Sequence, residues 1–162
     1  MRRQQPRPSS ASSAASRFRV RRSSVPNAVS PRGERTSVMT DGCEWIVDAR
    51  GCEPARIGDL ATMQSLFALI VAELSLAPVA AGVWHVFPDP GGITGLIPLA
   101  ESHLTVHTFP EHGSLCINLF CCRPRAEWPW AERLSEHVGA NHVHVRQLER
   151  RYAPVRTLAP SP

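Results

Sequence analysis

The chain has 162 residues, enough for one domain around a single core, and it carries 18 basic and 14 acidic residues. The excess of positive charge lies in residues 1–38, which contain nine Arg and one Glu, whereas the part from Met39 onward has a net charge of −4. The net charge of +4 therefore does not indicate a nucleic-acid-binding domain, and no segment is apolar enough for a secretory signal or a membrane span.

The types of basic and sulfur-containing residues argue against two further classes of protein, pyridoxal-phosphate enzymes and disulfide-bonded domains. Every basic residue is Arg, and without a Lys the chain cannot hold pyridoxal phosphate as an imine. Imine chemistry would therefore need a carbonyl from another source. The five cysteines are an odd number without a Cys-x-x-Cys pair, which predicts free thiols in a reducing, cytoplasmic compartment rather than a disulfide framework.

Three segments follow from the composition. Residues 1–38 are a basic, Arg/Ser/Pro-rich extension that we expect to be disordered, because they lack the apolar residues that could offset the entropy of ordering. A targeting peptide, an electrostatic arm for an anionic partner and a start upstream of the one used in translation are alternatives. Residues 39–153 form the folded domain, and residues 154–162 form a flexible C-terminal tail.

The first predicted elements are a strand and a helix. Residues 45–50 (WIVDAR) form a short strand that Gly51 and Cys52 end. From about Ala55 to Leu76, apolar residues recur at spacings of three and four, which predicts one amphipathic helix on a sheet. Pro54 lies in its first turn and Pro78 follows its end.

The rest of the domain consists mainly of strands joined by short turns. A second helix runs from Pro129 to Val138, Gly139 ends it, and an alternating strand follows at 142–149. The order β-α-β-β-β-β-α-β predicts an α+β fold: a two-layer α/β sandwich with a largely antiparallel sheet and two helices on one face. The four central strands are expected at 79–87, 93–100, 103–109 and 114–122.

The densest group of reactive side chains lies in AESHLTVHTFPEHGSLCINLFCC, residues 100–122. If PEHG is the turn of a hairpin, paired residues have numbers that sum to 223 or 224. Ser102 then lies opposite Cys121 or Cys122. Because adjacent strand residues point to opposite faces, only one of the two thiols can share a site with Ser102, and the spacing does not choose between them.

Several interpretations of this segment are open. Ser102, a histidine five residues later and a facing thiol form a compact group, but a core hairpin with polar ends explains the same pattern. A zinc site would use His103, His107, Cys121 and Cys122, yet adjacent cysteines on a strand point apart. A hydrolytic Ser–His nucleophile lacks a Gly-x-Ser-x-Gly elbow and an acidic partner.

The segment AESHLTVHTFPEHG, followed by a strand that ends in Cys122, resembles the signature of the prokaryotic S-adenosylmethionine decarboxylases. The resemblance implies a proenzyme that cuts itself between Glu101 and Ser102, after which Ser102 becomes a pyruvoyl group. Residues 1–38 have no counterpart. Most of 42–152 is similar to the family, with supporting likeness in GCEWIVDARGC (42–52), WHVFPDPGGITG (84–95) and HVHVRQLERRY (142–152).

The resemblance also implies roles for single residues. His107 matches the histidine needed for self-processing, and Cys122, not Cys121, matches the proton donor. Thr94 stands where the family usually has a serine that assists processing, and it keeps the hydroxyl. Two further positions are implied to contact substrate: Phe87 and Glu111.

The implied reaction uses a pyruvoyl group made from Ser102, without pyridoxal phosphate or metal. The substrate amine would form a Schiff base with the pyruvoyl group, carbon dioxide would leave, and Cys122 would protonate the α-carbon. The substrate implied is S-adenosylmethionine, the product the aminopropyl donor for spermidine, and the assembly a dimer of processed two-chain protomers without nucleic acid or membrane partners. A pyruvoyl-dependent arginine or ornithine decarboxylase and a non-catalytic regulatory partner are the alternatives.

Overall fold

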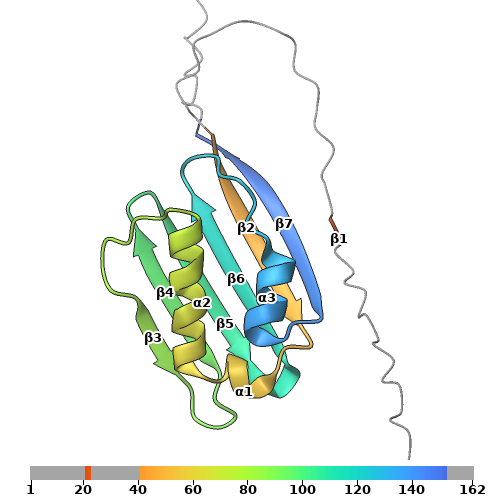
Figure 1. The fold of residues 1–162 in the computed structure, drawn as a ribbon. Helices are drawn as coiled ribbons and strands as arrows, with labels where there is room; N and C mark the ends of the chain where they lie inside the picture. Colours follow the sequence, from red (N-terminus) through yellow and green to blue (C-terminus); the bar gives the residue numbers. More distant parts are fainter. Residues whose placement is uncertain (1–20, 23–40, 153–162) are drawn as a thin grey trace, which may run out of the picture.

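The computed structural model describes residues 21–22 and 41–152, which form one mixed sheet with helices against it (Figure 1). The strand order is β1-β7-β2-β6-β5-β4-β3, and all neighbours are antiparallel except β1 and β7. The strands are β1 (Arg21–Arg22), β2 (Asp41–Arg50), β3 (Val83–Val86), β4 (Ile93–Leu99), β5 (Ser102–Phe109), β6 (Ser114–Cys121) and β7 (His142–Arg151).

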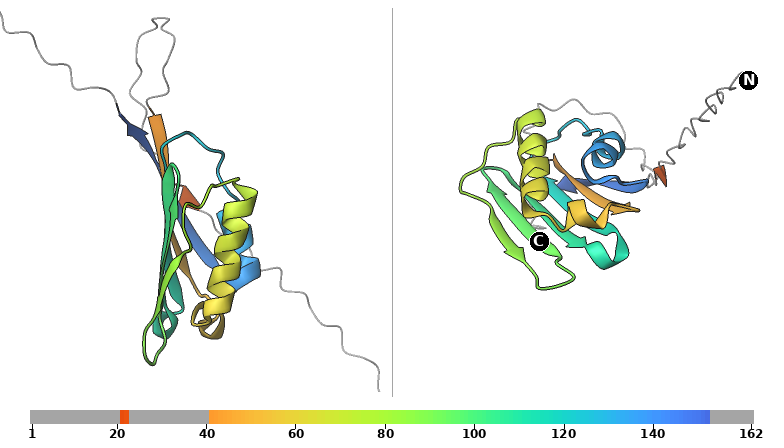
Figure 2. Two further views of the ribbon diagram at one scale, coloured as in Figure 1. Left: turned by 90° about the vertical axis from the view of Figure 1, so that its left-hand side faces the viewer. Right: turned by 60° about the horizontal axis from the view of Figure 1, so that its bottom comes forward.

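The helices gather on one face of the sheet, as the edge-on view in Figure 2 shows. They are α1 (Pro54–Ile57), α2 (Leu60–Glu73) and α3 (Trp130–Val138), and a 3-10 turn, η1, spans Pro110–His112. Strand side chains that point toward the helices are buried, for example Trp45 and Val47 of β2, while the residues between them are partly exposed. The predicted α+β sandwich is therefore confirmed, with the core between the sheet and α2 and α3.

The helix predicted between Ala55 and Leu76 is two helices. Gly58 ends α1, and the Asp59 carboxylate accepts a hydrogen bond from the Thr62 amide at 2.8 Å, which caps α2. The apolar spacing continues across the break because Ile57 and Leu60 are three residues apart. The strand predicted at 79–87 is also shorter, since β3 begins at Val83.

The β5–β6 hairpin has the first of the two predicted registers. Ser102 pairs with Cys121, so paired residue numbers sum to 223. Gly113 closes the turn after η1 with a φ of 54°, a left-handed conformation that favours glycine. The turn therefore fixes which thiol faces Ser102 across the hairpin.

Most of the predicted extension and tail cannot be compared with the structure. Residues 1–20, 23–40 and 153–162 lie outside the described residues. Arg21 and Arg22 form the short strand β1, which pairs in parallel with β7 at His144 and Val145. Within the described part of the chain, no helix is long and apolar enough to cross a membrane.

Candidate active site

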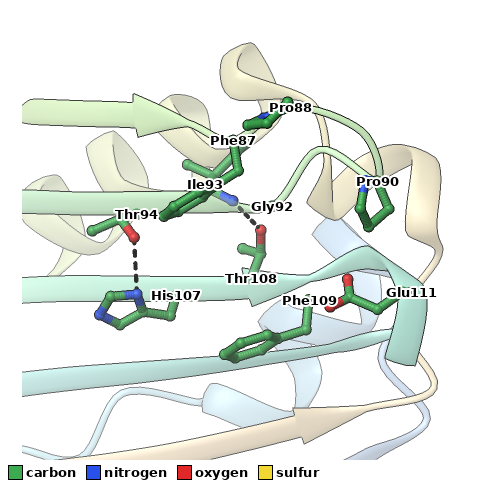
Figure 3. A pocket seen from close by; sticks show the side chains of 10 residues that line it. All are labelled: Phe87, Pro88, Pro90, Gly92, Ile93, Thr94, His107, Thr108, Phe109 and Glu111. Atoms are coloured by element: carbon green, nitrogen blue, oxygen red, sulfur yellow. Dashed lines mark hydrogen bonds between the residues drawn. The ribbon is translucent and has the colours of Figure 1, made fainter.

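A pocket lies at the end of the sheet next to η1, between the β3–β4 loop and β5 (Figure 3). It has a volume of about 250 Å³. It brings together four of the residues that the sequence singled out: Phe87, Thr94, His107 and Glu111. Loop residues from 87 to 92 form one wall, and β4 and β5 form another.

His107 is held from the neighbouring strand. Thr94 is its partner across β4 and β5, and the Thr94 hydroxyl and His107 Nδ1 are 2.9 Å apart, within hydrogen-bonding distance (Figure 3). This contact engages Nδ1 of His107, so Nε2 is the ring nitrogen that faces away from Thr94. One residue further along, the buried Thr108 hydroxyl accepts a hydrogen bond from the Ile93 amide at 2.8 Å. Both bonds fix β4 against β5 at the pocket.

The loop wall of the pocket carries an exposed aromatic ring. The Phe87 amide donates a hydrogen bond to the Gly92 carbonyl at 2.8 Å, which closes the loop between β3 and β4. The Phe87 ring is about half exposed and packs edge-on against the His85 ring, with 4.5 Å between centroids. On the other side, the exposed carboxylate of Glu111 lies in η1. The pocket thus offers an aromatic face and a negative charge.

Ser102 lies at the opposite end of β5, beside two buried thiols. Cys121 is its cross-strand partner, and Cys43 of β2 pairs with Cys121 from the other side. Burial raises the pKa of the Cys121 thiol, a nearby Cys43 raises it further, and a hydrogen bond with Ser102 partly opposes the shift. Both thiols therefore stay protonated at neutral pH, and Cys121 is the one that borders the serine on the helix side of the sheet.

Cys122 follows β6 and lies opposite Glu101 when the hairpin register is continued. The Cys122 amide donates a hydrogen bond to the Glu101 carbonyl at 2.9 Å. That carbonyl belongs to the peptide bond between Glu101 and Ser102. The Glu101 carboxylate also forms an ion pair with Arg123. The backbone and the side chain of Glu101 are therefore both anchored to the segment that carries Cys122, whose thiol is exposed.

The structure corrects the expected compact group of Ser102, a thiol and His107. Leu104 and Val106, which share the face of Ser102, are buried, whereas His107 is exposed on the other face. Five strand residues also span about 17 Å, at roughly 3.3 Å per residue. Ser102 and His107 of one chain are therefore separated by both distance and face.

The surroundings of Ser102 nevertheless suit the pyruvoyl group that the resemblance implies. A pyruvoyl group needs a serine whose hydroxyl reaches the preceding carbonyl, at a point where the chain can part. Ser102 is the first residue of β5, directly after the Ala100–Glu101 turn, and its side chain is partly exposed. The preceding carbonyl already accepts a hydrogen bond. The site therefore fits a group made from Ser102.

One polar network, on the face of the sheet away from the helices, was not predicted from the sequence. His103 Nε2 lies 3.2 Å from the Asn118 amide oxygen, and the Asn118 amide nitrogen donates to Glu44 at 2.8 Å. Glu44 also forms an ion pair with Arg150 at 2.9 Å. The Phe120 ring stacks on His103 at 5.4 Å and faces Arg150 at 5.7 Å. Strand alternation predicts a shared face, but the partners depend on a register across four strands.

Comparisons with known proteins identify the family to which the chain belongs. Residues 43–151 match a sequence model of the family described as S-adenosylmethionine decarboxylase. An S-adenosylmethionine decarboxylase proenzyme of Thermococcus kodakarensis is 31% identical over 71% of this chain and 80% of its own length. One from Pyrococcus abyssi is 34% identical, over 68% and 79%. Proenzyme 2 of Halalkalibacterium halodurans is 32% identical, over 75% and 94%.

A solved structure shares the fold. The adenosylmethionine decarboxylase of Aquifex aeolicus superposes with a TM-score of 0.54 at 20% identity, over 76% of this chain and all of that one. The family match covers the hairpin with Ser102, the pocket strands and both helices that cover the sheet. The chain therefore belongs to the S-adenosylmethionine decarboxylase family.

Proposed function

We propose that this chain is a proenzyme that cuts itself between Glu101 and Ser102 and then decarboxylates S-adenosylmethionine. The observation that carries the proposal is the geometry of the scissile peptide. Its carbonyl accepts the Cys122 amide at 2.9 Å, and its serine sits at a turn–strand junction within the segment shared with the family. We place the reaction in the cytoplasm, where the five free cysteines stay reduced.

Cleavage begins at the serine hydroxyl. Ser102 Oγ attacks the Glu101 carbonyl carbon, and the amide becomes an ester. As negative charge develops on the carbonyl oxygen, the Cys122 amide already points at it and stabilises it. Arg123 holds the Glu101 side chain, so the attacked residue stays in place. His107 then removes the Ser102 α-proton, and the bond between Ser102 Cβ and the ester oxygen breaks, so that one fragment ends at the Glu101 carboxylate. The dehydroalanine left at position 102 takes up water and releases ammonia, which gives the pyruvoyl group.

The His107 that acts on Ser102 must come from a second protomer, because the two residues of one chain are on opposite faces and about 17 Å apart. On the face of the sheet that no described helix covers, His107 is exposed together with apolar side chains that include Leu96, Phe109 and Leu148. Burying this face between two copies would place the pocket of one protomer against the Ser102 end of the other. The proposed assembly is therefore a dimer of processed protomers with two shared sites.

The pocket residues fit the proposed substrate. The pyruvoyl group, once made, supplies a carbonyl that binds the substrate amine and withdraws electrons as carbon dioxide leaves. The sulfonium of S-adenosylmethionine is a fixed cation, and the exposed Phe87 ring offers a cation–π contact. The Glu111 carboxylate can accept hydrogen bonds from ribose hydroxyls. Thr94 holds His107 in place.

Cys122 supplies the proton that replaces carbon dioxide. Its position opposite Glu101 means that it borders the start of the new chain once Glu101 has separated. A thiol is suited to this step because its pKa is close enough to neutrality for it to release and regain a proton. The product is the aminopropyl donor used to make spermidine.

Intact mass and product analysis test the proposal together. Purified protein should contain two fragments, split between residues 101 and 102, while a Ser102→Ala chain should stay whole. The processed protein should release carbon dioxide from S-adenosylmethionine and not from arginine or ornithine. An uncut wild-type chain would contradict the processing. Turnover of arginine or ornithine alone would keep the processing and overturn the substrate.

A further inference from the structure

We propose that Tyr152 is a positioning residue that orients the Cys122 thiol and stabilises the thiolate left after proton transfer. The inference rests on the proposed role of Cys122 as proton donor. It concerns a residue at the end of β7 that lies far from Cys122 in sequence. Three observations lead to it: the strand register, a glycine next to the thiol, and the position of the Tyr152 hydroxyl.

The strand register places Gly42 next to Cys122. Cys43 pairs with Cys121 across β2 and β6, and one further step puts Gly42 opposite Cys122. On its other side Gly42 pairs with Arg150 of β7, two residues before Tyr152. Cys122 therefore lies between Glu101 on the β5 side and a residue without a side chain on the β2 side.

The phenol of Tyr152 occupies the space that a side chain at position 42 would take. A Cβ atom built on Gly42 would overlap both the Tyr152 hydroxyl and the Cys121 carbonyl oxygen, and it would lie 3.1 Å from Tyr152 Cζ. The hydroxyl thus reaches the backbone next to Cys122. Glycine at position 42 is what allows the ring to cross β2 to the end of β6.

The Tyr152 hydroxyl and the Cys122 thiol interact at this position. Burial raises the pKa of Tyr152, the nearby Cys122 thiol raises it further through charge and hydrogen bonding, and Arg150 opposes the shift. Tyr152 therefore keeps its proton at neutral pH. A neutral phenol is able to donate a hydrogen bond to a thiolate, and such charge-assisted bonds are stronger than neutral ones.

This contact matters at one step of the proposed reaction. The proton leaves Cys122 Sγ for the substrate α-carbon, and the electron pair of the S–H bond stays on sulfur as a thiolate. The Tyr152 hydroxyl donates a hydrogen bond to that thiolate, and Sγ regains a proton from water before the next turnover. A fixed thiol also delivers its proton to one carbon rather than to alternatives nearby. Tyr152 does not itself touch the reacting carbon.

A Tyr152→Phe variant tests the inference, because it keeps the ring over Gly42 and removes only the hydroxyl. In the processed enzyme, kcat should fall roughly tenfold while KM stays within about twofold, as expected for one hydrogen bond to a charged group. Self-cleavage should be complete. The loss of that bond should also move the pH midpoint of Cys122 alkylation by iodoacetamide upward.

Peptide-resolved mass spectrometry reads the alkylation of Cys122 separately from that of the other four cysteines. An unchanged Cys122 midpoint, or a changed midpoint with wild-type kcat, would overturn the inference. A Cys122→Ala variant tests the proposed function separately. Full activity in that variant would remove Cys122 from the reaction, whereas a midpoint shift in Tyr152→Phe would still report the hydroxyl–thiol contact.

Discussion

The two ends of β5 carry different parts of the proposed chemistry. The Ser102 end holds the scissile peptide, two buried thiols and Cys122, whereas the His107 end holds a pocket with an aromatic ring, a carboxylate and a hydroxyl–imidazole pair. None of the pocket-lining residues belongs to the Ser102 end. The comparison teaches that one protomer brings its proposed catalytic residues to two separate places, which is why we propose that a second protomer completes each half-site.

The largest expected effect is a difference in kcat between variants of the two adjacent cysteines at the Ser102 end. Cys122→Ala should reduce the kcat of processed enzyme by roughly 100-fold or more, because general acid catalysis is lost. Cys121→Ala is the matched control, since this thiol is buried and faces the helices rather than the exposed side. Its kcat should stay within a few-fold of wild type. Activity is measured per cleaved chain, with cleavage quantified by intact mass.

The reverse ranking would contradict the assignment. If Cys121→Ala lost more activity than Cys122→Ala, the thiol next to Ser102 on the helix side would be the proton donor. The division of roles between the two ends of β5 would be unchanged, because both cysteines lie at the Ser102 end.

The next effect concerns the His107 end alone. Thr94→Val keeps the shape of the side chain and removes the hydroxyl that contacts His107 Nδ1 at 2.9 Å. Cleavage of freshly purified precursor should slow roughly tenfold, since an imidazole without its partner is free to turn. Thr94→Ser restores the hydroxyl and should cleave at a rate close to wild type. A wild-type cleavage rate in Thr94→Val would mean that the hydroxyl does not orient His107.

The smallest expected effect concerns the hydrophobic core, which supports both ends of β5. Burial raises the pKa of Cys52 from 9.0 to about 11. Because the folded state keeps this proton while the unfolded state loses it, the free energy of unfolding should fall as pH rises from about 9 to about 11. Urea unfolding in the presence of a reductant measures this slope. In Cys52→Ala the free energy of unfolding should decline less over this pH range. An equal decline in the variant and the wild type would mean that the raised pKa of Cys52 does not cause it.

The sequence predicted the β5–β6 hairpin well because the turn signal and strand alternation together define a register. The predicted pairing of Ser102 with one of two thiols is confirmed, and the structure selects Cys121. The same alternation already implied that His107, an odd number of residues from Ser102, lies on the other face. The expected compact group was wrong because spacing along the chain was taken for proximity.

Two further features were not predicted, the first despite a local signal and the second because no local pattern contains it. The break at Gly58 was missed because Ile57 and Leu60 keep the apolar spacing, although Asp59 followed by Thr62 is a capping pattern that could have signalled it. The contact of Tyr152 with the Gly42 strand needs the register of β7 against β2.

Mixing two inactive chains tests the central claim most directly. Ser102→Ala keeps its His107, and His107→Ala keeps its Ser102, so each alone should stay uncut. When the two are co-expressed with different tags and co-purified, a fraction of the His107→Ala chains should be cleaved between residues 101 and 102, because His107 of the partner subunit supplies the missing group. The Ser102→Ala chains should remain whole. If co-purified mixed dimers contain no cleaved chain, the two half-sites do not complete each other across protomers.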